Sequence, residues 1–188
     1  MPLEAALIGK VSAGILGVGA LGVTAVAVPF VTPALRKICL PYVPATDSQV
    51  DNVLQAIQTA KITSGHRAID LGSGDGRLVH AVSQLGCQVD GVELNPWLVL
   101  YSRLKSYQLR VSSNARFYRR DLFKWPLNNY DAVIIFGTES MMPILEKKLL
   151  AEVKPEAYLI ACRFPLTKFP LQETFGVGID TVWLYRNR

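Results

Sequence analysis

The stretch AIDLGSGDGR, residues 68–77, decides the fold. An apolar run with a single acid is typical of a buried strand, and the alternating glycines after it are typical of a turn that leads into a helix. Open α/β sheets bind their ligands where such a strand ends and the next helix begins. We therefore expect a ligand-binding turn at Gly72, Gly74 and Gly76.

The spacing of these glycines separates the turn from a dinucleotide site. The three residues read G-x-G-x-G, whereas dinucleotide-binding turns read G-x-G-x-x-G. Without side chains at these positions, a nucleoside and its amino-acid tail can lie directly against the backbone. Asp70, at the end of the strand, can accept hydrogen bonds from a cationic ammonium group and help to order the turn.

Two further acids follow expected strands. Glu93 ends the strand expected at 88–93, where a carboxylate can hold two ribose hydroxyls. Asp121 follows the short strand expected at 115–118 and can accept a hydrogen bond from an adenine amino group. Either acid alone is equally consistent with a helix cap or a surface position. Together with Asp70, the acids outline one nucleoside.

Strands and helices alternate through the rest of the chain, which predicts an α/β fold, a doubly wound Rossmann-like sheet. The helix that begins at Thr46 or Asp47 has one apolar face. Its members are Val50, Val53, Leu54 and Ile57. The expected strands cover 67–71, 88–93, 115–118, 131–136, 157–164 and 179–185. The helices between them are expected at 76–85, from Asn95 or Pro96 onward, and at 143–153.

The beginning of the chain is apolar. Residues 11–31 carry no charge, and a helix of that length can cross the hydrocarbon core of a membrane. Arg36 and Lys37 follow this run, so the charge rule for membrane proteins places the rest of the chain in the cytosol or the mitochondrial matrix. A cleaved signal peptide and a buried core helix fit the run less well, because it is too long for the first and lacks a polar face for the second.

These patterns divide the chain into three parts. An N-terminal segment, 1–35, contains the expected transmembrane helix at about 11–31, a proline-rich linker covers 36–46, and the α/β domain covers 47–188. Small residues at four-residue spacing in the first part would let a second helix approach closely. These residues are Gly9, Ala13 and Gly17.

The amino-acid composition limits the kinds of partner and catalytic site that this chain can have. The formal net charge is +5, with 20 Lys and Arg against 15 Asp and Glu, which suits an anionic lipid surface, an acidic partner or nucleic acid without selecting one. The cysteines, Cys39, Cys87 and Cys162, lie far apart and form no zinc pattern. With only His66 and His80 as histidines, neither a metal centre nor a Ser-His-Asp hydrolase is indicated, so we expect no metal.

The motifs resemble a known family. DLGSGDGR (70–77), VELNPW (92–97) and RDL (120–122) look like the motifs of class I, seven-strand S-adenosylmethionine methyltransferases. The segments 29–46, 93–103, 141–149, 161–164 and 178–183 resemble the mitochondrial protein-lysine methyltransferases that modify the ATP synthase c subunit. A sister enzyme acts on the adenine nucleotide translocase. The segment PFVTPALRK before the fold favours the c-subunit enzyme.

The resemblance implies a matrix-facing, single-pass enzyme of the mitochondrial membrane, with the ATP synthase c subunit as substrate, inner-membrane lipid around its anchor and no nucleic-acid partner. It implies S-adenosylmethionine as cofactor and S-adenosylhomocysteine as product. Asp70 and the turn would hold the methionine part, Glu93 the ribose, Asp121 with Leu122 the adenine, and Phe136 would lie beside the methyl group. The full cofactor-binding set is Asp70, Gly72, Ser73, Gly74, Gly76, Glu93, Asn95, Asp121, Leu122 and Phe136.

Methyl transfer to lysine requires a neutral amine, whereas free lysine, with a pKa of about 10.4, is almost entirely protonated at pH 7. Glu139, just beyond the fourth expected strand, is a candidate proton acceptor. The sequence 137–140, GTES, departs from the Val-Pro-Gln that follows the glycine in relatives. A nicotinamide-dependent oxidoreductase, a non-catalytic membrane scaffold and a small-molecule or RNA methyltransferase remain as alternatives.

Overall fold

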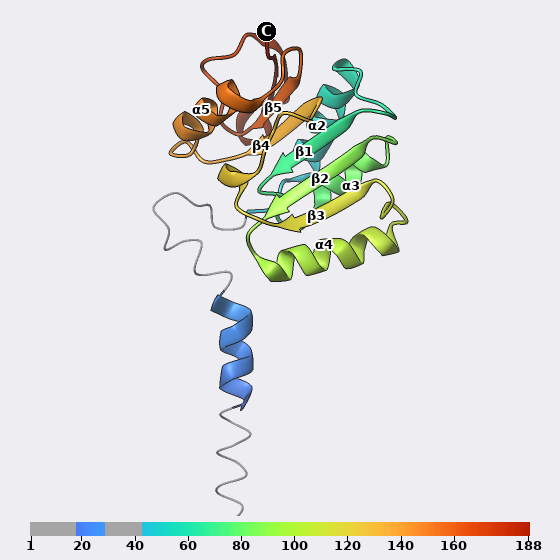
Figure 1. Ribbon diagram of the computed structural model, residues 1–188, viewed down its shortest axis with the longest axis vertical. Helices are drawn as coiled ribbons and strands as arrows, with labels where there is room; N and C mark the ends of the chain where they lie inside the picture. The colour runs from blue at the N-terminus through green and yellow to red at the C-terminus, as the bar shows by residue number, and fades with distance from the viewer. Residues whose placement is uncertain (1–17, 29–42) are drawn as a thin grey trace, which may run out of the picture. The chain divides into compact units, whose positions relative to one another are not determined.

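The computed structural model describes residues 18–28 and 43–188 (Figure 1). The chain divides into two compact units, Met1–Pro41 and Tyr42–Arg188. In the first unit, residues 18–28 form a helix. The second unit is a seven-stranded sheet with helices on both faces, which confirms the predicted Rossmann-like class I methyltransferase sheet.

The strand order is β3-β2-β1-β4-β5-β7-β6. All neighbouring strands from β3 to β5 are parallel, whereas β7 runs antiparallel to both β5 and β6. The order reverses between β1 and β4, so the ends of β1, β2 and β4 meet at the switch point where α/β sheets bind ligands. The strand bounds are β1 Arg67–Leu71, β2 Gln88–Glu93, β3 Ala115–Arg119, β4 Ala132–Phe136, β5 Tyr158–Cys162, β6 Leu171–Phe175 and β7 Val182–Arg186.

Two apolar layers hold the helices to the sheet. Helices α2 (Asp47–Thr59), α3 (Arg77–Ser83) and α4 (Pro96–Gln108) pack on one face, and α5 (Met142–Glu152) packs on the other. The predicted apolar face of α2 is confirmed, because Val53 and Ile57 are fully buried there. Thr46 begins α2 through a capping box with Gln49, in which each side chain accepts from the other's backbone N–H.

Strand β6 is absent from the sequence-based prediction. Four of its five residues are exposed, and only Phe175 is buried, so the segment lacks the apolar run that marks the central strands. The last expected strand, 179–185, is also corrected. Residues Gly178–Asp180 form the short 3-10 helix η3, and β7 begins only at Val182. β6 exists because it hydrogen-bonds to β7, a tertiary contact that its own residues do not encode.

The predicted transmembrane helix at 11–31 is wrong. Among residues 18–28 and 43–188, no helix is both long enough and apolar enough to cross a membrane. The helix observed in this region covers 18–28. The proposed pairing face at Gly9, Ala13 and Gly17 lies outside the described residues.

Candidate functional site

The glycine turn lies at the carboxyl end of β1. Gly72, Gly74 and Gly76 have φ angles of 88°, 53° and 80°, in the left-handed region that favours glycine. The N–H groups of Gly72 and Ser73 both donate to the Val92 carbonyl, at 2.9 and 3.0 Å, which ties the turn to β2. The predicted turn is therefore present, and its backbone requires the glycines.

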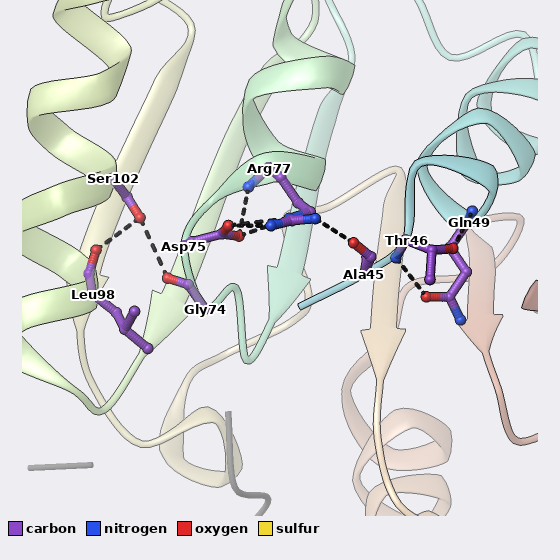
Figure 2. Close-up of polar contacts among 8 residues, drawn as sticks. All are labelled: Ala45, Thr46, Gln49, Gly74, Asp75, Arg77, Leu98 and Ser102. Carbon is purple, nitrogen blue, oxygen red and sulfur yellow. Dashed lines mark hydrogen bonds and ion pairs between the residues drawn. The ribbon is translucent and has the colours of Figure 1, made fainter. Parts of the chain in front are cut away.

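Two side chains hold the turn from opposite sides (Figure 2). On one side, the Ser102 hydroxyl of α4 lies 3.3 Å from the Gly74 carbonyl and 2.8 Å from the Leu98 carbonyl. On the other side, Arg77 forms an ion pair with Asp75 at 2.7 Å and donates to the Ala45 carbonyl, just before α2. These contacts fix the turn between α4 and the start of the domain. The contacts of Ser102 with Gly74 and of Arg77 with Ala45 were not predicted from the sequence, because each joins separate segments.

Asp70 is buried below the turn, with one carboxylate oxygen, Oδ1, that has no hydrogen-bond partner within residues 18–28 and 43–188. Burial, reinforced by the negative charges of Glu93 and Asp75, raises the pKa of Asp70 to about 8. The Ser73 hydroxyl is also buried without a partner in the same part of the structure. A buried acid of this kind fits a cationic ligand group, which would supply the missing partner.

Glu93 joins the turn to α4. Its Oε2 accepts the Gly74 N–H at 3.1 Å, and its Oε1 accepts the Asn95 N–H at 2.7 Å. Asn95 is the N-cap of α4, since its side chain accepts the Trp97 N–H at 3.0 Å. The structure therefore brings Glu93 and Asn95 to the glycine turn, whereas their contact with a cofactor stays a prediction.

The other predicted residues surround the same strand ends. Asp121 is the N-cap of the 3-10 helix η2 (Leu122–Lys124), because its Oδ1 accepts the Phe123 N–H at 3.0 Å. The alternative interpretation of this acid as a helix cap is therefore correct for Oδ1. Leu122 lies over the turn, with its Cδ2 3.9 Å from the position that a Cβ on Gly72 would take. Phe136 is buried at the end of β4, beside β1. Adenine recognition by Asp121 stays a prediction.

Arg163 is a residue at this edge that the sequence analysis missed. It follows β5 directly and has a φ of 70°, a conformation that costs a non-glycine residue about 1 kcal/mol or more. Its N–H donates to the Thr181 carbonyl at 3.1 Å, and its guanidinium carbon lies 5.5 Å from the centre of the Phe136 ring. Both contacts depend on the pairing of β5 with its neighbours, so no local pattern indicates them.

Glu139 lies in the turn between β4 and α5 and is exposed to solvent. The same turn is closed by the Met141 N–H, which donates to the Thr138 carbonyl at 2.9 Å. Because β4 ends at Phe136, Glu139 is on the same edge of the sheet as the glycine turn. Its position is therefore compatible with the proposed proton transfer, which stays a prediction.

No group of three or more His, Cys, Asp or Glu side chains within residues 18–28 and 43–188 is placed to hold a metal ion. His80 instead links two helices: its Nε2 lies 3.0 Å from the Ser102 carbonyl, and burial lowers its pKa. Cys87 and Cys162 are both buried as free thiols.

Replacing Gly76 by alanine is expected to lower the free energy of unfolding by about 2 to 4 kcal/mol, because a Cβ there adds backbone strain and steric overlap. The added atom would lie 2.7 Å from Phe117 Cε1 in a residue whose φ is 80°. Denaturant unfolding measures the effect. Gly65→Ala is the matched control, since Gly65 has a φ of 94° but nothing within 4 Å. Equal losses in the two variants would show that overlap with Phe117 contributes nothing.

Comparisons with known proteins identify the family to which this chain belongs. Residues 70–173 match the family described as the ANTKMT methyltransferase domain, and residues 5–36 match the N-terminal domain of the ATP synthase c-subunit lysine N-methyltransferases. The ATP synthase c-subunit lysine N-methyltransferase of Xenopus laevis is 49% identical over 177 residues, which cover 94% of this chain and 76% of the relative. The chain belongs to the ATP synthase c-subunit lysine N-methyltransferase family. It is therefore an S-adenosylmethionine-dependent protein-lysine N-methyltransferase.

One more relative and one solved structure are also similar to this chain. Adenine nucleotide translocase lysine N-methyltransferase of Mus musculus is 38% identical, and the match covers 81% of this chain and 67% of that protein. A solved RNA methyltransferase from Salinibacter ruber, in complex with S-adenosylhomocysteine, is 25% identical with a TM-score of 0.70 and covers 77% of this chain and 93% of that chain. Asp70 Oδ1 and Ser73 Oγ, which have no hydrogen-bond partner in the part of the chain that the structure describes, fit the cofactor that this family uses.

Proposed function

We propose that this chain transfers methyl groups from S-adenosylmethionine to a lysine side chain of the ATP synthase c subunit. The observation that carries the proposal is the 45 to 49% identity, over at least 92% of the chain, with five relatives of that name. The buried Asp70 below the glycine turn supports the same interpretation, because its Oδ1 has no hydrogen-bond partner among the described residues and can therefore accept from the cationic cofactor.

The adenine nucleotide translocase is the second candidate substrate. Its support is the match of residues 70–173 to the ANTKMT domain and the 38% identity with the mouse enzyme. The match of residues 5–36 to the N-terminal domain of the c-subunit enzymes favours the c subunit.

The residues at the strand ends have defined tasks in this proposal. The glycine turn and Asp70 bind the methionine part, Glu93 binds the ribose hydroxyls, and Asp121 with Leu122 binds the adenine. When bound, S-adenosylmethionine supplies a methyl group on a positively charged sulfur that leaves as a neutral thioether. In the complex, Phe136 and its neighbours would exclude water from the methyl group and help to align the acceptor amine with it.

The proposal is tested with the purified chain, labelled S-adenosylmethionine and each candidate substrate in its membrane. We expect label on a lysine of the c subunit, identified by mass spectrometry, and none on the translocase. Label on the translocase alone would reverse the order of the two candidates. Cofactor binding without transfer to any protein would instead favour a non-catalytic scaffold.

Glu139→Gln tests the proton acceptor. If Glu139 takes the lysine proton, the variant should lose about a hundredfold or more in kcat, with unchanged cofactor affinity, because the amide cannot accept that proton. Steady-state rates from pH 6 to 10 measure the loss in kcat. This loss should become smaller at high pH, because the substrate lysine is then already deprotonated. Ser140→Ala, a change in the same exposed turn, is the control. A variant with full activity at pH 7 would remove Glu139 from the mechanism.

We also propose that the catalytic domain works on the matrix side of the mitochondrial inner membrane. This location rests on the proposed substrate, since residues 5–36 match the N-terminal domain of enzymes named for the ATP synthase c subunit. A C-terminal epitope tag should fractionate with mitochondria and resist protease until the inner membrane is opened. Digestion of the tag after rupture of the outer membrane alone would contradict the proposal.

A further inference from the structure

Helix α4 is apolar on the side that faces away from the domain. Its inner side packs against β3 and β2, as the burial of Leu98 and Val99 shows. Residues that recur every three or four positions form a second apolar row on the opposite side. This outer stripe consists of Leu100, Tyr101, Leu104 and Tyr107, with exposed fractions of 48, 51, 57 and 72%.

The outer stripe does not contribute to the core. A surface helix normally places polar residues on the side opposite its buried face. Figure 1 shows α4 alongside β3, the strand at the edge of the sheet, and the exposed fractions show that no described segment covers its outer residues. A contiguous exposed row of large apolar side chains indicates a surface that binds something.

The stripe lies in a strongly basic part of the surface. Between Glu93 and Asp121 the sequence has six cations and no acid. Five of the six are exposed and Lys105 is partly buried. Within residues 18–28 and 43–188, none of the six forms an ion pair, whereas Arg67, Lys148, Lys154 and Arg186 elsewhere in the domain each have a carboxylate partner. The six cations are Arg103, Lys105, Arg110, Arg116, Arg119 and Arg120.

Three of the six cations lie on α4 or directly after it, beside the stripe. At 3.6 residues per turn, Arg103 flanks the apolar row on one side and Lys105 flanks it on the other. Arg103 keeps its place because its Nη2 donates to the Phe117 carbonyl of β3 at 2.7 Å. Arg110 follows the end of the helix and is exposed. The result is a row of leucines and tyrosines bordered by positive charge.

We propose that the outer face of α4 docks on an anionic phospholipid surface. Leucine and tyrosine side chains enter the boundary between headgroups and acyl chains, and the flanking cations contact the phosphates. This contact requires no helix that crosses the membrane. Since the N-cap of α4, Asn95, lies beside the glycine turn, the same contact would hold the catalytic edge of the domain close to the lipid.

The composition of the stripe favours lipid over other occupants. A second copy of the chain would bring cations against cations, with no acid between Glu93 and Asp121 to pair with them. Single-stranded nucleic acid binds by stacking its bases on aromatic rings. Here the branched, aliphatic Leu100 and Leu104 occupy the centre of the row, and such side chains do not stack with bases.

Sedimentation of the full chain with liposomes tests the role of charge. We compare neutral phosphatidylcholine vesicles with vesicles that contain 30% phosphatidylglycerol, so that the difference isolates the anionic contribution. Lys105→Gln with Arg110→Gln should weaken binding to the anionic vesicles about 25-fold, at about fivefold for each charge. The matched control is Lys147→Gln with Arg188→Gln, two exposed cations elsewhere. Equal binding by both double variants would overturn the proposal.

A fluorophore at position 104 reports the contact itself. In a full-length Cys39→Ser background, Leu104→Cys is labelled with an environment-sensitive dye, and Leu150→Cys on the exposed side of α5 is the control. Anionic vesicles should shift the emission to the blue at position 104 and leave position 150 unchanged. A shift at 104 with an RNA oligonucleotide but not with vesicles, or one that depends on protein concentration alone, would contradict lipid docking in favour of RNA or of self-association. No shift at 104 would also contradict it.

Discussion

Asp70→Asn is expected to make the ligand-free protein more stable while it weakens binding of S-adenosylmethionine about a hundredfold. The carboxylate is buried, its Oδ1 lacks a partner within residues 18–28 and 43–188, and its pKa is raised to about 8. Ionised, it is unfavourable in the free protein and favourable beside a bound cation. Stability and function therefore oppose each other at this residue.

The pH dependence follows from the direction of the pKa shift. The folded-state pKa of Asp70, about 8, lies above its ordinary value of 3.8. The stability linked to this group is fully present below about pH 4 and is lost as pH rises toward 8, because the unfolded chain ionises first. The asparagine variant should lack this loss, so its free energy of unfolding should exceed that of the parent by about 2 kcal/mol at pH 8.

Cofactor binding should show the opposite dependence. A cationic ligand favours the ionised carboxylate, so affinity for S-adenosylmethionine should rise with pH until Asp70 is ionised in the free protein, near pH 8. Calorimetry at pH 7 in buffers of different ionisation enthalpy should detect close to one proton released by the parent and none by Asp70→Asn. The control is Asp90→Asn, because Asp90 is also buried but accepts from Tyr130 at 2.7 Å and pairs with Arg67. If Asp70→Asn binds the cofactor as tightly as the parent does, the predicted site is wrong.

Glu93→Gln should lower the affinity for S-adenosylmethionine about a hundredfold or more. The carboxylate accepts N–H groups from Gly74 and Asn95, and in the complex it would also accept ribose hydroxyls. Glutamine keeps one acceptor oxygen and adds an NH₂ donor that would face a backbone N–H group. The glycine turn and the ligand would therefore each lose a charge-assisted hydrogen bond. Calorimetric binding of both S-adenosylmethionine and S-adenosylhomocysteine measures the loss.

The control for Glu93 is Glu152→Gln. Glu152 forms a helical ion pair with Lys148 on α5 and is partly exposed, so the same change of charge should leave cofactor binding unaltered. Thermal unfolding separates a local loss of binding from a loss of fold, since Glu93→Gln should still unfold cooperatively. A dissociation constant for Glu93→Gln within twofold of the parent value would assign the ribose to another residue.

Much of the fold of this domain could be predicted from the sequence, because the signals for its strands and turns lie within short stretches of the chain. The strand at 67–71, the three glycines after it and the acid at 93 all follow from hydrophobic periodicity and turn chemistry within short stretches. The prediction failed where these signals were misleading or absent. The apolar run at 11–31 satisfied a length criterion for a membrane span, yet no described helix meets it. Strand β6 has four exposed residues and therefore no apolar pattern to detect.

The sequence alone determined the order of elements, the position of the glycine turn and which acids follow the strands, since each depends on neighbours along the chain. The tertiary structure alone decided the properties of those residues. Asp70 has a raised pKa because the fold buries it near Glu93 and Asp75. Arg163 lies over Phe136 because β5 pairs with β4, and the turn is held by Ala45 and Ser102 because α2 and α4 pack beside it. Burial and contacts between distant segments set these energies, and neither can be read from residues taken in order.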